Sequence, residues 1–141
     1  MYGGQNDQGE ILDTLKVLSY KPEMGGLVWE KPSTRGTLPP ALYMHSMSYY
    51  REQEMLVIYG GKSGGFFQKG GYQSVEMTID NVYVLILERM LWVRPRVHNS
   101  HSLRPRFGHC SCINSGKLYI FGGTTDDHYQ EFRLEKIELS K

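Results

Sequence analysis

The chain has 141 residues, a formal net charge of +1 and 40% hydrophobic residues. This size suits one domain with an apolar core, and the balanced charge argues against a general nucleic-acid or membrane binder. No apolar run is long enough for a membrane-spanning helix, and no signal peptide is visible at the start. The 16 glycines and 10 tyrosines favour short strands joined by tight turns.

The first part of the chain, residues 1–42, opens on Met-Tyr-Gly-Gly. A strand is predicted over residues 14–19 and a turn over 22–26. A second strand is predicted over residues 27–30 and carries Trp29. The opening four letters resemble the ends of two later apolar runs, so they read as the tail of a strand.

The middle part, residues 43–106, contains four predicted strands. The first carries His45 among small residues, and the second is a continuous apolar run that ends at Gly60 and Gly61. A continuous apolar run is typical of a strand that is buried on both faces. The third and fourth strands carry Tyr83 and Trp92. The four predicted ranges are 43–49, 55–59, 82–87 and 91–94.

The last part, residues 107–141, repeats the first three of these strands. Strands are predicted over residues 107–113, which carry His109, and over 117–121, which end at Gly122 and Gly123. A third is predicted over residues 132–139. Gly pairs, tryptophans, histidines and an Asp or Asn before a strand thus recur in one order at nearly one interval, which indicates an internal repeat. No segment has helical periodicity, so almost no helix is expected.

This pattern resembles the kelch repeat: an apolar strand ending in Gly-Gly, a strand with Tyr and a strand with Trp. The second unit matches best, through Gly60, Gly61, Tyr83 and Trp92, whereas in the first unit Leu15 stands at the place of the Tyr. The resemblance implies an all-β fold of kelch-type β-propeller blades, each a four-stranded antiparallel sheet. The repeat signature comprises Gly60, Gly61, Tyr83, Trp92, Gly122, Gly123, Trp29, His45 and His109.

The number of strands is too small for a closed propeller, which usually has four to eight blades. The expected order is two strands of a first blade (residues 1–42), a full second blade (43–106) and three strands of a third blade (107–141). We therefore expect an incomplete ring. The chain is interpreted mainly as part of a longer propeller; a split piece completed by a partner chain and assembly with its own copies are the alternatives.

The resemblance also implies that two sets of loops lie on one face, which commonly binds partner peptides. One of these loops, residues 94–106, has four Arg, two His and no acidic residue, which would suit an acidic peptide. The alternative is a solvated loop whose Arg side chains pair with neighbours such as Asp126 and Asp127. The candidate residues in this loop are Arg94, Arg96, His98, His101, Arg104 and Arg106.

A second candidate is the long connection over residues 62–80. Long loops are often functional, and exposed aromatic side chains are frequent binding anchors. The alternatives are that the aromatics fold back over the blade edge or that the segment is mobile. The candidate residues are Lys62, Phe66, Phe67 and Tyr72.

Other motifs do not indicate a site. Gly61-Lys62-Ser63 lacks the earlier Gly and the following helix of a phosphate-binding loop. His109 lies on the opposite face of its strand from Cys110 and Cys112, and a closed zinc site needs four ligands, so the cysteines are interpreted as small core residues. The histidines and the Trp and Tyr residues are interpreted as packing residues. No metal and no cofactor is expected.

The expected function is therefore a non-catalytic protein-interaction or scaffold module. A permanent structural subunit of a large complex, of cytoskeletal or ciliary type, is the alternative, and a kelch-like metal oxidase fragment is less favoured because no ligand cluster is found. Two cysteines at i and i+2 and the absence of a glycosylation sequon favour an intracellular protein, cytoplasmic or cytoskeleton-associated.

Overall fold

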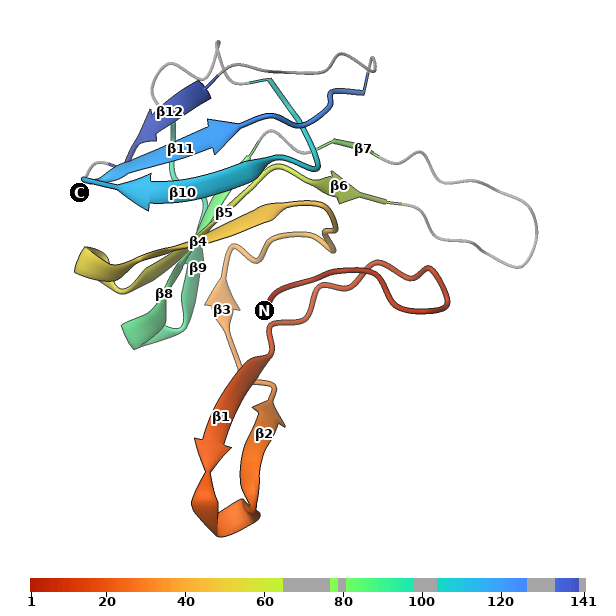
Figure 1. Ribbon diagram of the computed structural model, residues 1–141, viewed down its shortest axis with the longest axis vertical. Coiled ribbons are helices and arrows are strands. Elements are labelled where there is room, and N and C mark those ends of the chain that lie inside the picture. The colour runs from red at the N-terminus through yellow and green to blue at the C-terminus, as the bar shows by residue number, and fades with distance from the viewer. Residues whose placement is uncertain (65–76, 79–80, 98–103, 127–133, 140–141) are drawn as a thin grey trace.

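The computed structural model describes residues 1–64, 77–78, 81–97, 104–126 and 134–139 (Figure 1). These residues form short strands and three 3-10 turns, without an α-helix, which confirms the all-β expectation. None of them belongs to a helix that could cross a membrane. The strands are β1 (Val17–Lys21), β2 (Gly26–Glu30), β3 (Arg35–Gly36), β4 (Ser46–Tyr50), β5 (Met55–Tyr59), β6 (Lys62–Ser63), β7 (Met77–Thr78), β8 (Val82–Ile86), β9 (Leu91–Val93), β10 (Cys110–Asn114), β11 (Lys117–Phe121) and β12 (Leu134–Glu138). The turns are η1 (Pro22–Met24), η2 (Arg51–Gln53) and η3 (Leu87–Arg89).

The largest sheet has the order β3-β9-β8-β5-β4, and its last four strands are antiparallel. We call these four strands the second blade. β5 and β8 lie at its centre, and the side chains of Val57, Ile58 and Tyr59 are buried because both faces of the sheet are covered. β5 occupies the residues predicted for it.

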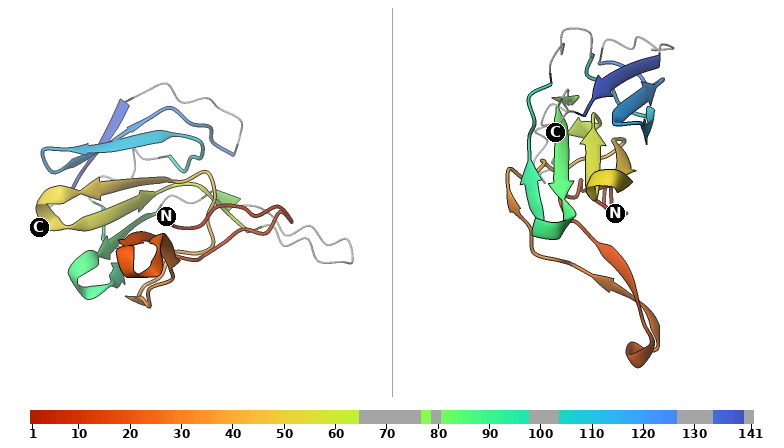
Figure 2. Two further views of the ribbon diagram at one scale, coloured as in Figure 1. Left: turned by 60° about the horizontal axis from the view of Figure 1, so that its bottom comes forward. Right: turned by 90° about the vertical axis from the view of Figure 1, so that its left-hand side faces the viewer.

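Strands β10, β11 and β12 form a second antiparallel sheet, the third blade, which packs against β4 (Figures 1 and 2). The β1–β2 hairpin projects away from both sheets. The first residues of the chain run antiparallel to the residues just before β1, with hydrogen bonds in both directions between Met1 and Lys16. We call these residues and the hairpin the first blade; the opening residues pair through isolated bridges outside the named strands, Tyr2 with Leu15 and Gln5 with Ile11.

The pairing of Tyr2 corrects the register assumed for the first blade. Tyr2 bridges Leu15, whereas its equivalent Tyr59 pairs with Val82. Leu15 is therefore the equivalent of Val82, and Lys16 stands at the place of Tyr83. The aromatic position of the signature is occupied by a charged residue in this blade.

Strand β3 was not predicted. It lies in the connection between the first and second blades and pairs in parallel with β9, at the outer edge of the second blade. The N–H of Arg35 donates to the carbonyl of Met90, and that of Thr37 donates to Trp92. This connection therefore covers the edge of β9 instead of forming a free loop, and the central sheet has five strands.

Two apolar clusters fill the spaces between neighbouring blades. Tyr2, Leu15 and Leu42 meet Ile58, Leu85 and Trp92 of the second blade to form the first cluster. On the other face of the second blade, Val57, Tyr59 and Val84 meet the third blade. The third-blade residues in this second cluster are Leu118, Ile120 and Ile137.

Candidate interaction face and its supporting core

The Gly-Gly pairs are required by close packing as well as by turn geometry. Gly60 has φ +62°, and a Cβ there would lie 2.5 Å from the carbonyl oxygen of Arg106 and 2.7 Å from a ring carbon of His109. Gly61 has φ +90°, and its Cβ would lie 2.7 Å from the Cβ of His45. The Gly60–Gly61 pair is thus wedged between His45 on its own blade and His109 on the next, which explains why Gly and His recur together in these blades.

His109 links the second and third blades. Its Nε2 lies 2.8 Å from the hydroxyl oxygen of Ser46, and its ring packs edge-on against Tyr59. Ser48 and Ser111 continue the contact through hydroxyl groups 2.7 Å apart. Burial lowers the pKa of His109 to about 4, with a further contribution from the positive charge of Arg106. His109 is therefore a neutral, structural residue, and burial lowers the pKa of His45 as well.

The lowered pKa predicts a loss of stability in mild acid. Between its unfolded pKa near 6.5 and its folded pKa near 4, His109 binds more protons when the chain is unfolded, so stability falls as pH falls. The slope from this residue is at most about 1.4 kcal/mol per pH unit. Urea unfolding at pH 7.5, 6.0 and 5.0 measures it, with His109→Gln as the non-titrating control. The difference in the free energy of unfolding between wild type and His109→Gln should shrink toward pH 5. A difference that stays constant would mean that other groups cause the loss of stability in acid.

The position of Arg106 does not fit the partner-binding role predicted for it. Its side chain is fully buried, and its Nη2 lies 2.8 Å from Oε2 of Glu135 on β12. It also donates hydrogen bonds to the carbonyl oxygens of Arg104 and Gly122. Arg106 thus ties its loop to the third blade and cannot contact a partner. Sequence reasoning missed this pair because Glu135 lies far along the chain.

The remaining loops gather at one end of the blades, where β5 and β11 finish (Figure 1). We call this end the loop face. The β6–β7 hairpin of the second blade is held to the third blade there, because the backbone N–H and the hydroxyl of Thr78 both donate to Asp126. The ammonium group of Lys62 lies 4.4 Å from the ring centre of Phe107. Asp126 and Lys62 therefore join the blades, so part of their capacity for hydrogen bonds and charge interactions is used within the chain.

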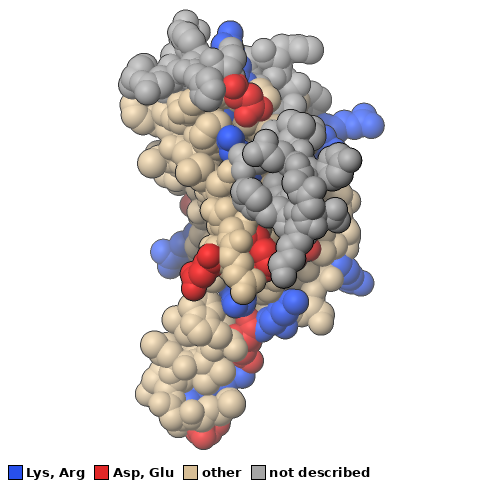
Figure 3. Space-filling model, turned by 90° about the vertical axis from the view of Figure 1, so that its right-hand side faces the viewer, with Lys and Arg blue, Asp and Glu red and all other residues tan. Residues whose placement is uncertain are grey.

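Three arginines of the predicted site are exposed: Arg94, Arg96 and Arg104. Arg94 donates a hydrogen bond to the side chain of Asn81, and the carbonyl of Arg104 accepts one from Tyr59. Figure 3 shows the loop face, where charges of both signs are interspersed among the described residues. The exposed arginines thus belong to a surface of mixed charge rather than to a broad basic field.

Several predicted residues lie outside the described part of the chain. In the connection over residues 62–80 these are Phe66, Phe67 and Tyr72. In the connection over residues 94–106 they are His98 and His101, and Asp127 follows Asp126 beyond the described region.

Two packing predictions are wrong for this chain. Cys110 and Cys112 are exposed, although the equivalent Ser46 and Ser48 are buried. The serines are covered by β10, whereas no described segment covers the cysteine face of β10. Trp29 is 56% exposed for the same reason, whereas its equivalent Trp92 is 1% exposed. Among the described residues, no group of three His, Cys, Asp or Glu gathers as metal ligands.

The comparisons with known proteins agree with this geometry. A family model described as the KLHDC2/KLHL20/DRC7 Kelch-repeats domain matches residues 1–131. The chain belongs to the kelch-repeat family. This kelch chain is 30% identical over 123 residues to host cell factor 1 of Rattus norvegicus, a match that covers 84% of the chain and 5% of that protein. It is 34% identical over 93 residues to the Rho GTPase-activating protein gacHH of Dictyostelium discoideum, covering 65% of the chain and 5% of that protein.

The solved structures place the kelch chain in the propeller fold. It superimposes with a TM-score of 0.71 on a chain from a cryo-EM structure of RAG in complex with one melted and one unmelted RSS. The match covers 97% of the kelch chain and 41% of the other chain, with 18% identity. The curated relatives are much longer proteins: the kelch chain covers 5% of host cell factor 1 and 5% of gacHH. At this identity the structural match shows the fold alone, and the described sheets do not close a ring.

Proposed function

We propose that this kelch segment is a non-catalytic protein-interaction module, which acts as part of a larger propeller or assembly and binds a partner on its loop face. The observation that carries the proposal is the cross-linking of neighbouring blades at that face. Thr78 with Asp126, and Lys62 with Phe107, hold the loops of the second and third blades together. A rigid support for exposed loops is a common basis for binding sites.

The partner chemistry follows from the exposed arginines. Arg96 and Arg104 are exposed and belong to the same connection, which has no acidic residue. Guanidinium groups pair with carboxylates in a bidentate geometry, so the proposed ligand is an acidic peptide. The cellular setting proposed with it is intracellular, cytoplasmic or cytoskeleton-associated.

The variant Arg96→Ala with Arg104→Ala tests the loop face. We expect it to weaken the tightest binder from an acidic peptide array at least tenfold in titration calorimetry, since two charge-assisted contacts are lost. Its thermal unfolding should match wild type because both side chains are exposed.

Arg51→Ala with Arg89→Ala is the matched control. It removes the same charge from exposed side chains of η2 and η3, at the opposite end of the blades. Equal weakening by both double variants would show that net charge alone drives binding, and would reject the loop face as the site.

A second candidate function is a permanent structural subunit of a large complex, of cytoskeletal or ciliary type. It is favoured by apolar side chains that stay exposed on the outer blades: Leu27, Trp29, Phe121 and Leu134 are each more than half exposed. Large exposed apolar patches usually mark interaction surfaces. A purified chain that remains a soluble monomer over a wide concentration range would argue against permanent assembly.

A further inference from the structure

Met44, in the connection that leads into β4, has a left-handed backbone conformation with φ +55°. This conformation is unfavourable for a residue with a bulky side chain. The other described non-glycine residues with positive φ are Glu54, Met90 and Ser115. Glu54 and Met90 each close a 3-10 turn, and Ser115 lies in the turn between β10 and β11. Turn closure of this kind does not explain the conformation of Met44.

The third blade has a glycine at the place of Met44. Gly108 precedes His109 as Met44 precedes His45, and its φ is +65°. The N–H of Gly108 donates a hydrogen bond to the carbonyl oxygen of Met44, so the two residues lie together where the second and third blades meet. Glycine adopts positive φ at little cost. The second blade therefore has a methionine where a glycine would be less strained.

The side chain of Met44 contributes little to the packing of the blades. It is 54% exposed, and it belongs to neither apolar cluster of the described residues. A Cβ added at the equivalent Gly108 would meet no described atom within 4 Å, so this position of a blade faces open space. Backbone strain of this kind clusters at functional sites. A strained residue with an exposed apolar side chain thus indicates a binding role for Met44.

Met44 lies at the loop face. β4 and β5 are antiparallel, so the residues that lead into β4 lie at the end where β5 finishes. Tyr43 exchanges two backbone hydrogen bonds with Lys62, whose ammonium group lies 4.4 Å from the ring centre of Phe107. Met44 is thus held beside the contacts that join the second and third blades.

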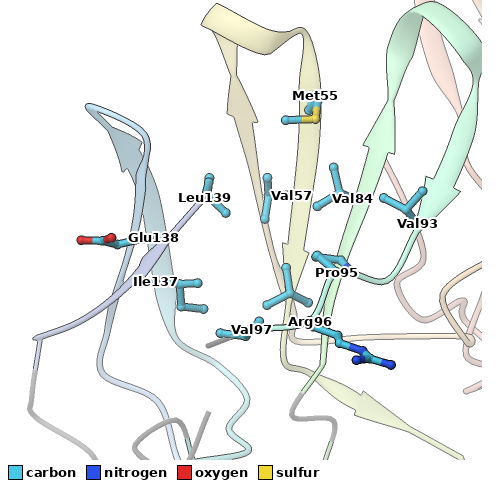
Figure 4. Close-up of a pocket in the computed structure, with 11 residues that line it drawn as sticks. Met55, Val57, Val84, Val93, Pro95, Arg96, Val97, Ile137, Glu138 and Leu139 are labelled. Carbon is cyan, nitrogen blue, oxygen red and sulfur yellow. The ribbon is translucent and has the colours of Figure 1, made fainter. Parts of the chain in front are cut away.

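Two exposed arginines belong to the connection that meets Met44. The carbonyl oxygen of Arg104 accepts a hydrogen bond from Tyr59, which pairs with Ser46, two residues after Met44. Arg96 is also exposed, and Figure 4 shows its charged end pointing away from the apolar side chains between the blades. An exposed apolar side chain beside guanidinium groups fits a partner that carries an apolar residue among carboxylates.

We propose that Met44 is a specificity-determining residue of the loop face, where it contacts an apolar side chain of the acidic partner peptide. This contact selects peptides in which an apolar residue stands among the carboxylates. The unbranched thioether side chain of methionine suits such a role because it adapts to partners of different shape. The inference rests on the proposed function, because it assigns a further contact on the same face.

A panel of acidic peptides tests this assignment. Each peptide has the sequence Asp-Glu-Gly-X-Gly-Glu-Asp, in which X is Leu, Phe, Met, Ser or Gly. In titration calorimetry with the full chain, we expect Leu, Phe or Met at X to bind about tenfold more tightly than Ser or Gly, because an apolar side chain is buried against Met44. Binding that does not depend on X would overturn the inference alone. No binding by any peptide of the panel would overturn both the proposed function and the inference.

Three substitutions of Met44 separate the side chain from the backbone strain. Met44→Ala keeps a left-handed residue without the thioether and should remove the preference for an apolar X, whereas Met44→Leu should retain it. Met44→Gly should also remove the preference, and its thermal unfolding should lie at or above that of wild type because the strain is relieved. A preference that persists in Met44→Ala would overturn the assignment. A marked loss of thermal stability in Met44→Gly would make Met44 a packing residue and would overturn it too.

Met90→Gly is the matched control. Met90 has φ +47° and closes η3 at the opposite end of the blades, so the same substitution is made in a similar backbone conformation away from the loop face. The preference for an apolar X should be unchanged in this variant. Its loss in Met90→Gly as well as in Met44→Gly would point to a general effect on the fold and would reject Met44 as the contact.

Discussion

Replacing Glu135 by Ala should destabilise the chain by about 3 kcal/mol, because it leaves the charge of Arg106 buried without its partner. The Arg106 side chain is fully buried, and that of Glu135 is 17% exposed, so water can compensate little. Urea unfolding at pH 7.5 measures the loss, followed by the fluorescence of the buried Trp92. A loss below about 1 kcal/mol would be the behaviour of an exposed ion pair and would contradict the buried role.

The chain contains its own apolar replacement for this pair. Leu42 precedes the second blade as Arg106 precedes the third: the carbonyl of each accepts a hydrogen bond from the second Gly of the preceding pair. Tyr83 stands where Glu135 stands, in the same register relative to the central strand. Arg106→Leu with Glu135→Tyr should therefore recover most of the stability that either single change removes, since buried ion pairs are often replaceable by packed apolar groups.

Replacing Gly61 by Ala should cost about 2–4 kcal/mol, from left-handed backbone strain and from forced contacts. The added Cβ would lie 2.8 Å from the carbonyl oxygen of Tyr43 and 2.7 Å from the Cβ of His45, and backbone cannot move aside easily. Thermal or urea unfolding of the purified variant gives the loss.

Gly4→Ala is the matched control for this substitution. Gly4 is the equivalent residue of the first blade, with φ +98° beside +90° for Gly61, but no atom lies within 4 Å of an added Cβ. Gly4→Ala should show the strain alone, about 1–2 kcal/mol. Equal losses for the two variants would mean that packing against His45 contributes nothing to the Gly-Gly signature.

Local sequence patterns predicted most of the strands. The runs that became β5 and β11 are short, apolar and closed by Gly pairs, and their predicted bounds match those observed. β3 could not be predicted, because Arg35 and Gly36 have no strand pattern and pair with β9 only through the path of the connection. The sequence alignment of the blades put Leu15 one residue out of place, at the position of Tyr83 rather than Val82. It had used a marker residue, and not the strand pairing, to align the blades.

Burial was harder to predict than strand position, because it depends on what covers a strand. Ser46 and Cys110 occupy equivalent positions, yet one is buried under β10 and the other is exposed. Arg106 looked like its three neighbouring arginines in sequence, and only the position of Glu135 sets it apart. For the candidate site, the sequence indicated two loops but could not separate the buried Arg106 from the exposed arginines of the same loop.

The parallel pairing of β3 with β9 also constrains the order in which the chain folds as it is synthesised. Arg35 pairs with Leu91, and Gly36 pairs with Trp92. The segment between the first two blades can settle only after Leu91–Val93 have left the ribosome, although the β1–β2 hairpin can form long before. This connection is therefore the last part of the first two blades to be fixed, because it waits for the outermost strand of the second blade.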